Sequence, residues 1–207
     1  LLFFLLSSFA ATRYRFALKE ALGVQEGRRG ERRASNVLAN GLAPVFVAGL
    51  AFLETPWFPR SVSGLIYISV LAVAGADTIA SEIGVLSPNA YLFVTGRKVP
   101  PGTNGAVSVL GQLCALAAAL YTAIFGWVFL ALNPPSYGFV VTVPANVALL
   151  AIPVAVGFIG CQIDSLLGET LERRGYIGKT TVNLIATSAG GVIAYVLLWA
   201  PTGVLPA

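Results

Sequence analysis

Three acidic residues, Asp77, Glu82 and Asp164, lie within or at the ends of long apolar segments. Carboxylates retained inside a bilayer are costly to desolvate, so their default interpretation is functional. The segments Asp77 to Glu82 and Asp164 to Glu169 follow the same pattern: Asp, a hydroxyl residue, two apolar residues, a small residue and Glu.

Mg²⁺ prefers oxygen ligands and commonly bridges to substrate phosphates. We therefore interpret Asp77, Glu82 and Asp164 as candidate metal ligands. The alternative is that each carboxylate is neutral or bonded to Thr78, Ser81 or Ser165.

A glycine-rich loop, Thr95 to Gly105, leads into the next apolar segment. Glycines let the backbone approach an anion closely, and the free N–H groups at a helix N-terminus favour negative charge. Lys98 adds a point charge suited to phosphate, although a lysine beside a membrane can also be only a topology signal. The loop is a candidate phosphate-binding element, with a helix expected to begin near Gly105.

A basic stretch precedes the second apolar segment and contains Arg28 and Arg29. These arginines could clamp a phosphate or bind anionic lipid headgroups. Asn36 and Asn40 stand four residues apart and therefore share one helix face. We interpret Asn40, which lies deeper, as facing the bundle or a ligand.

The composition assigns the class of protein. Of the 207 residues, 57% are hydrophobic and 11% are charged, far below the roughly 25% charged residues of soluble domains. The chain is therefore interpreted as a polytopic membrane protein in contact with lipid, with no indication of nucleic-acid binding. Cys114 and Cys161 lie in apolar segments, and the chain has no histidine, so neither a disulfide framework nor a thiolate metal site is expected.

Six apolar stretches are compared with the ~20 residues that cross the hydrocarbon core. Backbone groups in lipid must be satisfied internally, which predicts helices, an all-α bundle and a single transmembrane domain over residues 1–207. The first stretch is too short to span alone. It is interpreted as the end of a helix that starts before Leu1, or alternatively as the apolar part of a signal peptide. The stretches cover about residues 1–12, 36–53, 61–84, 105–132, 139–168 and 182–199.

Basic residues occur in alternate connections. Arg60 is the exception among the 13; the other twelve follow the first, third and fifth stretches. The positive-inside rule places those connections in the cytoplasm. The third and fifth helices should then run in the same direction and bring Asp77 and Asp164 to a similar depth on the cytoplasmic side.

Four motifs together resemble one family. Residues 28–41, 76–84, 98–108 and 160–170 are similar to the DUF92 integral membrane family, which includes plant phytyl-phosphate kinase and TMEM19-like proteins. The resemblance implies a CTP-dependent kinase that converts an isoprenyl monophosphate to the diphosphate. It matches Asp77 to a Mg²⁺-binding aspartate and the Lys98 to Gly105 segment to a nucleotide-phosphate loop.

The expected site combines both lines of reasoning. Mg²⁺ and CTP are the expected cofactor and donor, an isoprenyl phosphate is the expected substrate, and homo-oligomerisation is left open. A phosphate acceptor already carries an oxyanion, so it needs no conspicuous base. The alternatives are a lipid-phosphate cytidylyltransferase and an ion-coupled transporter. Expected catalytic residues are Asp77, Lys98, Asn104 and Asp164; nucleotide-binding residues are Lys98, Gly102, Thr103, Asn104, Gly105 and Ser108; lipid-phosphate residues are Arg28, Arg29, Asn36 and Asn40.

Overall fold

Long apolar helices make up most of the structure, a computed structural model that describes residues 2–25, 27, 34–53, 58, 60–133 and 146–199. Within these residues, five helices are long and apolar enough to cross a membrane. The predicted all-α transmembrane bundle is confirmed. The helices, in chain order, are α1 (Leu2–Arg13), α2 (Phe16–Ala21), α3 (Ala34–Leu53), α4 (Arg60–Gly84), α5 (Val109–Leu132), α6 (Ala151–Leu167) and α7 (Lys179–Trp199).

Two boundaries of α6 and α7 differ from those expected, and a third, the start of the fifth stretch, is not tested. A 3₁₀ turn, Val147–Leu150, precedes α6, and the start expected near residue 139 lies outside the described residues. A π-helical segment, η3 (Gly168–Glu172), continues α6 past its expected end. α7 begins at Lys179, three residues before the apolar run. Hydropathy misses such ends because a polar first or last turn carries no apolar signal.

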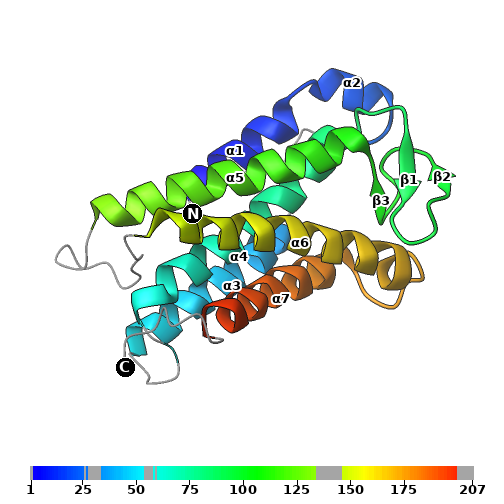
Figure 1. The fold of residues 1–207 in the computed structure, drawn as a ribbon. Helices are drawn as coiled ribbons and strands as arrows, with labels where there is room; N and C mark the ends of the chain where they lie inside the picture. The colour runs from blue at the N-terminus through cyan, green and yellow to red at the C-terminus, as the bar shows by residue number, and fades with distance from the viewer. Residues whose placement is uncertain are drawn as a thin grey trace.

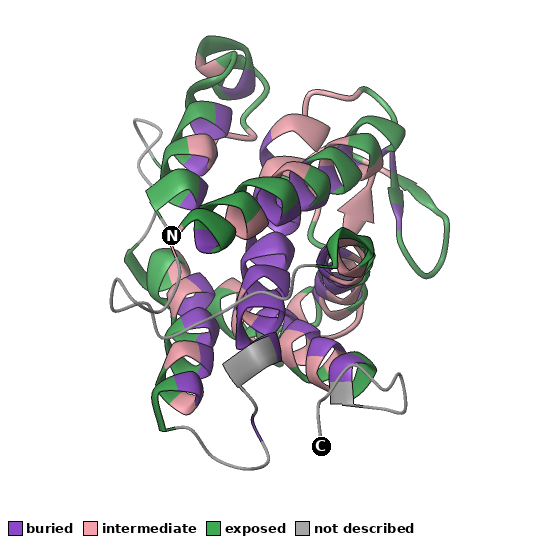
Figure 2. Ribbon diagram, turned by 60° about the vertical axis from the view of Figure 1, so that its left-hand side comes forward, coloured by how far each residue is buried: buried purple, intermediate pink, exposed green. Residues whose placement is uncertain are grey.

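α4 is the central helix of the bundle. It contacts α1, α3, α5, α6 and α7, and 83% of its apolar window is buried, against 33–39% for the other four spans. Its burial is visible as the purple helix in the middle of Figure 2. The outer helices expose many apolar side chains, as expected where lipid is the solvent. Most residues of α4, including Asp77 and Glu82, are therefore surrounded by protein.

Glycines on the outer helices let them approach α4 closely. A Cβ on Gly157 would meet the Cβ of Ala72 at 2.8 Å, and a Cβ on Gly160 or Gly190 would overlap the side chain of Val73. Small residues at such contacts are typical of membrane helices, which associate mainly through close packing. This packing holds α6 and α7 against the middle of α4, about one turn before Asp77.

We expect Gly160→Leu to destabilise the bundle by roughly 1–3 kcal/mol, the usual effect of overpacking a filled core. The added side chain would displace Val73 and separate α4 from α6. Gly49→Leu is the matched control, because a Cβ at Gly49 in α3 meets nothing within 4 Å. Thermal unfolding in detergent should show a lower midpoint for Gly160→Leu alone, and equal midpoints for both variants would contradict this packing.

A small antiparallel sheet connects α4 to α5. It consists of β1 (Ala90–Leu92), β2 (Lys98–Val99) and β3 (Ala106–Val107), in the order β2-β1-β3. The expectation that the glycine-rich loop runs directly into a helix near Gly105 is wrong. α5 begins at Val109, where the Ser108 hydroxyl accepts a hydrogen bond from the Gly111 N–H. The backbone of Gly102 to Gly105 is thus part of a loop between strands and not a helix N-terminus.

One end of the bundle gathers the sequence motifs. α4 and α6 run in the same direction and both end near the sheet, while α3 and α7 begin there (Figure 1). We call this the motif end: the sheet, the C-terminal turns of α4 and α6, and the N-terminal turns of α3 and α7. The parallel direction inferred from the basic residues is confirmed. That the motif end faces the cytoplasm stays a prediction.

Candidate functional site

Asp77 of α4 and Asp164 of α6 meet at the ammonium group of Lys179, the first residue of α7. The Lys179 Nζ lies 2.7 Å from Asp164 Oδ1 and 3.9 Å from Asp77 Oδ1. The carboxylate side chains are 12% and 7% exposed, whereas the Lys179 side chain is 40% exposed. The predicted juxtaposition of the two aspartates is found, and one cation bridges two nearly buried anions at a site that solvent can reach.

Asn183 completes this cluster. With its amide nitrogen turned toward the neighbouring acceptors, it donates to Asp164 Oδ2 and to the Lys179 carbonyl, both at 3.2 Å; this orientation is assigned from the hydrogen-bond network. Asn183 lies four residues after Lys179, so both side chains share one face of α7. In the sequence, Lys179 counts only among the twelve basic residues that indicate the topology, and Asn183 is not predicted as a site residue. The sequence pattern that could have indicated them is a pair of polar residues four positions apart in the first turns of an apolar helix.

The serines near the two aspartates do not hold them. Ser81 donates to the Thr78 carbonyl at 3.0 Å, and Ser165 donates to the Cys161 carbonyl at 3.1 Å, each within its own helix. Asp164 is instead satisfied by Lys179 and Asn183. The alternative in which these serine hydroxyls stabilise the carboxylates is therefore not what the structure contains.

The two carboxylates of the cluster are of the kind that could hold a magnesium ion. Two carboxylates already converge on one cationic group, Lys179, and with all three groups ionised the cluster carries one net negative charge. Within the described ranges, no three acidic or cysteine side chains gather into a metal cage. Mg²⁺ needs no such cage, because it is usually held by one or two carboxylates together with substrate phosphates and water.

Glu82 belongs to a different cluster. Its two oxygens accept hydrogen bonds from Thr12 Oγ1 and Lys19 Nζ, each at 2.8 Å. Lys19 is fully buried and also donates to the carbonyls of Ala11 and Thr12 at the end of α1. The structure thus places the predicted metal ligand Glu82 in an ion pair that fastens the α1–α2 segment to α4. We remove it from the metal site.

Glu169 has yet another function. Its carboxylate accepts hydrogen bonds from the backbone N–H groups of Val94 and Thr95 and from the Thr95 hydroxyl. Gly105, with φ of +74°, packs directly against the Glu169 backbone, where a Cβ could not fit. The loop between β1 and β3 is therefore docked on η3. In the two similar motifs the first acids, Asp77 and Asp164, meet at Lys179. The second acids, Glu82 and Glu169, bind different partners.

The other loop residues lie at the motif end without contacting the aspartates. Lys98 Nζ donates to Asn89 Oδ1 at 2.8 Å, and Thr103 Oγ1 donates to the Pro100 carbonyl at 2.7 Å. Asn104 and Gly102 are exposed. Ser108 also donates to the Gly84 carbonyl at 3.1 Å and so joins the start of α5 to the end of α4. The structure brings the loop to the same end as Asp77 and Asp164, but not into one cluster with them.

We expect Gly105→Ala to undock this loop. The added Cβ would collide with the Glu169 backbone, in addition to the strain of a positive φ. Gly96→Ala is the matched control, because Gly96 has φ of +64° but open space around it. Hydrogen exchange of the Val94 and Thr95 amides should be at least about tenfold faster in Gly105→Ala than in Gly96→Ala. Leaving the buried partners of these amides unpaired costs about 1–3 kcal/mol, which corresponds to roughly a tenfold or larger change in the opening equilibrium. Equal exchange in both variants would contradict the docking.

Asn36 of α3 is bonded to the start of α7, and Asn40 shares its helix face. Thr180 Oγ1 donates to Asn36 Oδ1 at 3.4 Å, one residue after Lys179. Asn40 is buried in the same helix. This part of the predicted lipid-phosphate site therefore lies beside the carboxylate–lysine cluster. Arg28 and Arg29 lie outside the described residues.

These features define a polytopic integral membrane protein in which two nearly buried aspartates meet a partly exposed lysine at one end of the helix bundle. The chain belongs to the family described as integral membrane protein DUF92, whose model matches residues 1–195. The resemblance inferred from the four motifs is thereby confirmed.

Relatives occur in archaea, cyanobacteria and plants. The chain is 34% identical over 167 residues to an uncharacterized membrane protein of Methanocaldococcus jannaschii, covering 80% of this chain and 62% of that protein. It is 32% identical over 188 residues to an uncharacterized membrane protein of Synechocystis, covering 89% and 67%. It is 30% identical over 194 residues to Protein VTE6, chloroplastic, of Arabidopsis thaliana, covering 91% and 54%. The chain thus spans roughly half to two thirds of these relatives. No solved structure matches it significantly.

Proposed function

We propose that this protein is a CTP-dependent kinase that transfers a phosphoryl group to an isoprenyl monophosphate, giving the diphosphate. The observation that supports the proposal most is the convergence of Asp77 and Asp164 on Lys179 at a solvent-accessible point of the motif end. This is a suitable arrangement for a metal-bound phosphate ester. The isoprenyl acceptor and the CTP donor are what the family resemblance implies.

In the proposed reaction, an oxygen of the lipid monophosphate attacks the γ-phosphorus of the nucleotide. The bond between that phosphorus and the β–γ bridging oxygen breaks, and CDP leaves with the negative charge. Phosphoryl transfer requires positioning and charge neutralisation more than covalent participation by the protein. Mg²⁺ held by Asp77 and Asp164 would supply charge neutralisation at the transferring phosphate.

The chain's own side chains have three tasks in this proposal. Asn183 and Lys179 orient Asp164, and the exposed part of Lys179 is available to an anionic phosphate. Lys98, Thr103 and Asn104, with the backbone of Gly102 and Gly105, would contact the nucleotide, and Ser108 would position this loop through its hydrogen bond to Gly84. The lipid phosphate would bind near Asn36 and Asn40, with Arg28 and Arg29 preceding them in the chain.

The acceptor class agrees with the residues available. The chain contains no histidine, and both aspartates of the cluster are bound to, or close to, the Lys179 ammonium. An alcohol acceptor would benefit from a general base, whereas a monophosphate is already an oxyanion near neutral pH. This favours a phosphate acceptor over an alcohol.

The test is a detergent-solubilised assay with CTP, Mg²⁺ and geranylgeranyl or phytyl monophosphate. We expect CDP and the prenyl diphosphate as products, with no turnover when EDTA replaces Mg²⁺. Pyrophosphate and a CMP-linked lipid would instead identify a cytidylyltransferase. If no nucleotide is consumed with any acceptor, the kinase proposal fails and ion-coupled transport is the next hypothesis to test.

A further inference from the structure

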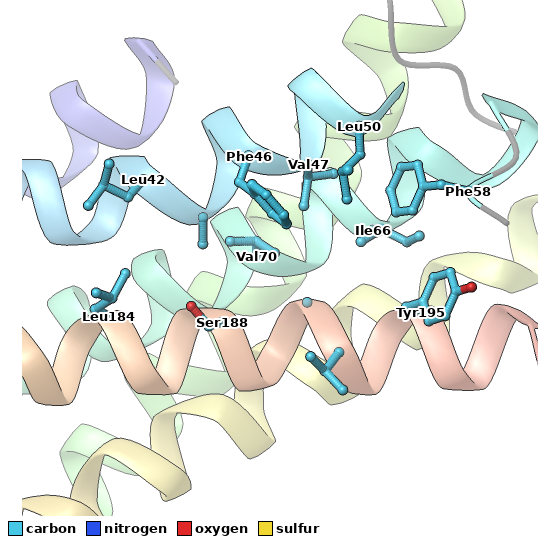
Figure 3. A pocket seen from close by; sticks show the side chains of 13 residues that line it. Leu42, Phe46, Val47, Leu50, Phe58, Ile66, Val70, Leu184, Ser188 and Tyr195 are labelled. Carbon is cyan, nitrogen blue, oxygen red and sulfur yellow. The ribbon is translucent and has the colours of Figure 1, made fainter. Parts of the chain in front are cut away.

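An apolar groove lies between α3 and α7, with α4 as its floor (Figure 3). Its volume is about 430 Å³, within the usual range of about 300–1,000 Å³ for small-molecule sites. Most of its lining is aliphatic or aromatic, with Ser188 and Tyr195 of α7 as the residues that carry a hydroxyl. The groove is thus suited to a hydrocarbon chain.

The groove begins beside the carboxylate–lysine cluster. Leu184, at one end of the lining, directly follows Asn183, which contacts Asp164. On α3, Leu42 lies at the same end of the groove, two residues after Asn40. An amphiphile with its apolar tail in the groove would therefore place its polar head at the motif end.

The opposite end is formed by two aromatic side chains. The rings of Phe58 and Tyr195 stack with centroids 6.0 Å apart and planes inclined by 5°, and both lie at the end of the groove away from Leu42 and Leu184 (Figure 3). From Leu184 to Tyr195, eleven residues at about 1.5 Å per residue give a length of about 16 Å. The groove therefore has a defined length as well as a direction.

We propose that this groove binds the isoprenoid tail of the substrate and that the Phe58–Tyr195 pair sets the longest chain accepted. The inference rests on the proposed function and adds its chain-length determinant. In an extended chain three bonds span at most about 3.5 Å, so the four main-chain bonds of one isoprene unit span roughly 5 Å. A groove of about 16 Å therefore holds about three units, the length of a farnesyl chain, and a geranylgeranyl or phytyl chain would place its remaining unit beside the polar head at the motif end.

Two substitutions change the length of the groove in opposite directions. Ser188 lies one helical turn beyond Leu184, so Ser188→Trp leaves space for about one isoprene unit. It should reduce turnover of geranylgeranyl phosphate relative to geranyl phosphate by about 10-fold or more, because excluded apolar contacts in a pocket discriminate by 10–200-fold. Tyr195→Ala opens the far end and should raise the relative turnover of a five-unit chain. The matched control is Val196→Trp, which adds the same bulk at an exposed position outside the lining.

Photolabelling tests the groove independently of turnover. An isoprenoid monophosphate with a diazirine at the end of its tail should label peptides that contain residues 42–50 of α3 or 184–195 of α7. Geranylgeranyl phosphate should compete with the label, whereas phosphatidylcholine should not. If this labelling is observed but no assay shows turnover, the groove would still be an isoprenoid-binding site and the kinase proposal would be rejected.

Two results would overturn the inference itself. Equal competition by phosphatidylcholine would show that the groove holds ordinary membrane lipid. The second result is that the enzyme turns over isoprenyl phosphates but its preference for chain length is unchanged in both Ser188→Trp and Tyr195→Ala. The kinase proposal would then stand, and this groove would not be its chain-length determinant.

Discussion

Asp77→Asn is expected to lower the rate of phosphoryl transfer by at least about 100–1,000-fold, the usual effect of removing one preorganised electrostatic group from an active site. Asparagine is nearly the same size, so the packing around the end of α4 is kept. The shorter ion pair of the cluster, Lys179 with Asp164 at 2.7 Å, is also kept. The variant removes one of the two negative charges that would hold Mg²⁺.

The measurement compares CDP release and Mg²⁺ dependence in the wild-type protein and the variant. Ser69→Ala is the control. Ser69 is also a buried polar residue of α4, two turns before Asp77, and among the residues that the structure describes its hydroxyl bonds only the Leu65 carbonyl of its own helix. We expect that control to keep its activity and both variants to unfold at similar temperatures. Undiminished CDP release by Asp77→Asn would remove the metal assignment.

Lys19→Met is expected to destabilise the protein by about 3–5 kcal/mol, the typical result of removing one partner from a buried ion pair. The Lys19 side chain is fully buried and Glu82 is 8% exposed, so the Glu82 carboxylate would be left without its counter-charge in the protein interior. The carbonyls of Ala11 and Thr12 would also lose their donor. The α1–α2 segment should then separate from α4.

The double variant Lys19→Met/Glu82→Leu is the matched control. Replacing both partners of a buried ion pair with apolar groups is often neutral or stabilising, so this variant should regain much of the lost stability in thermal unfolding. A wild-type unfolding temperature for Lys19→Met would contradict the assignment. An unaltered stability of Glu82→Gln, combined with weaker Mg²⁺ dependence, would return Glu82 to the metal site.

The local signals in the sequence were sufficient for the long apolar helices and for the two aspartates of the site, Asp77 and Asp164. Apolar runs of about 20 residues determine spanning helices because the bilayer leaves the backbone no other partner. The alternation of basic connections indicated that α4 and α6 are parallel, and the shared depth of Asp77 and Asp164 followed from that direction. These inferences depend on length and charge along one segment at a time.

Only the tertiary structure decided which side chains meet. Lys19 and Glu82 are 63 positions apart, and Asp77 and Lys179 are separated by two further helices. Their contacts depend on how each helix is rotated about its axis, and the glycines that pack against Ala72 and Val73 determine that rotation for α6 and α7. The loop differs from expectation for a similar reason. The local pattern indicated a loop that ends in a helix N-terminus. Instead, glycines with positive φ form a connection between strands, and this connection is held by hydrogen bonds to Glu169, which lies 75 residues after Val94.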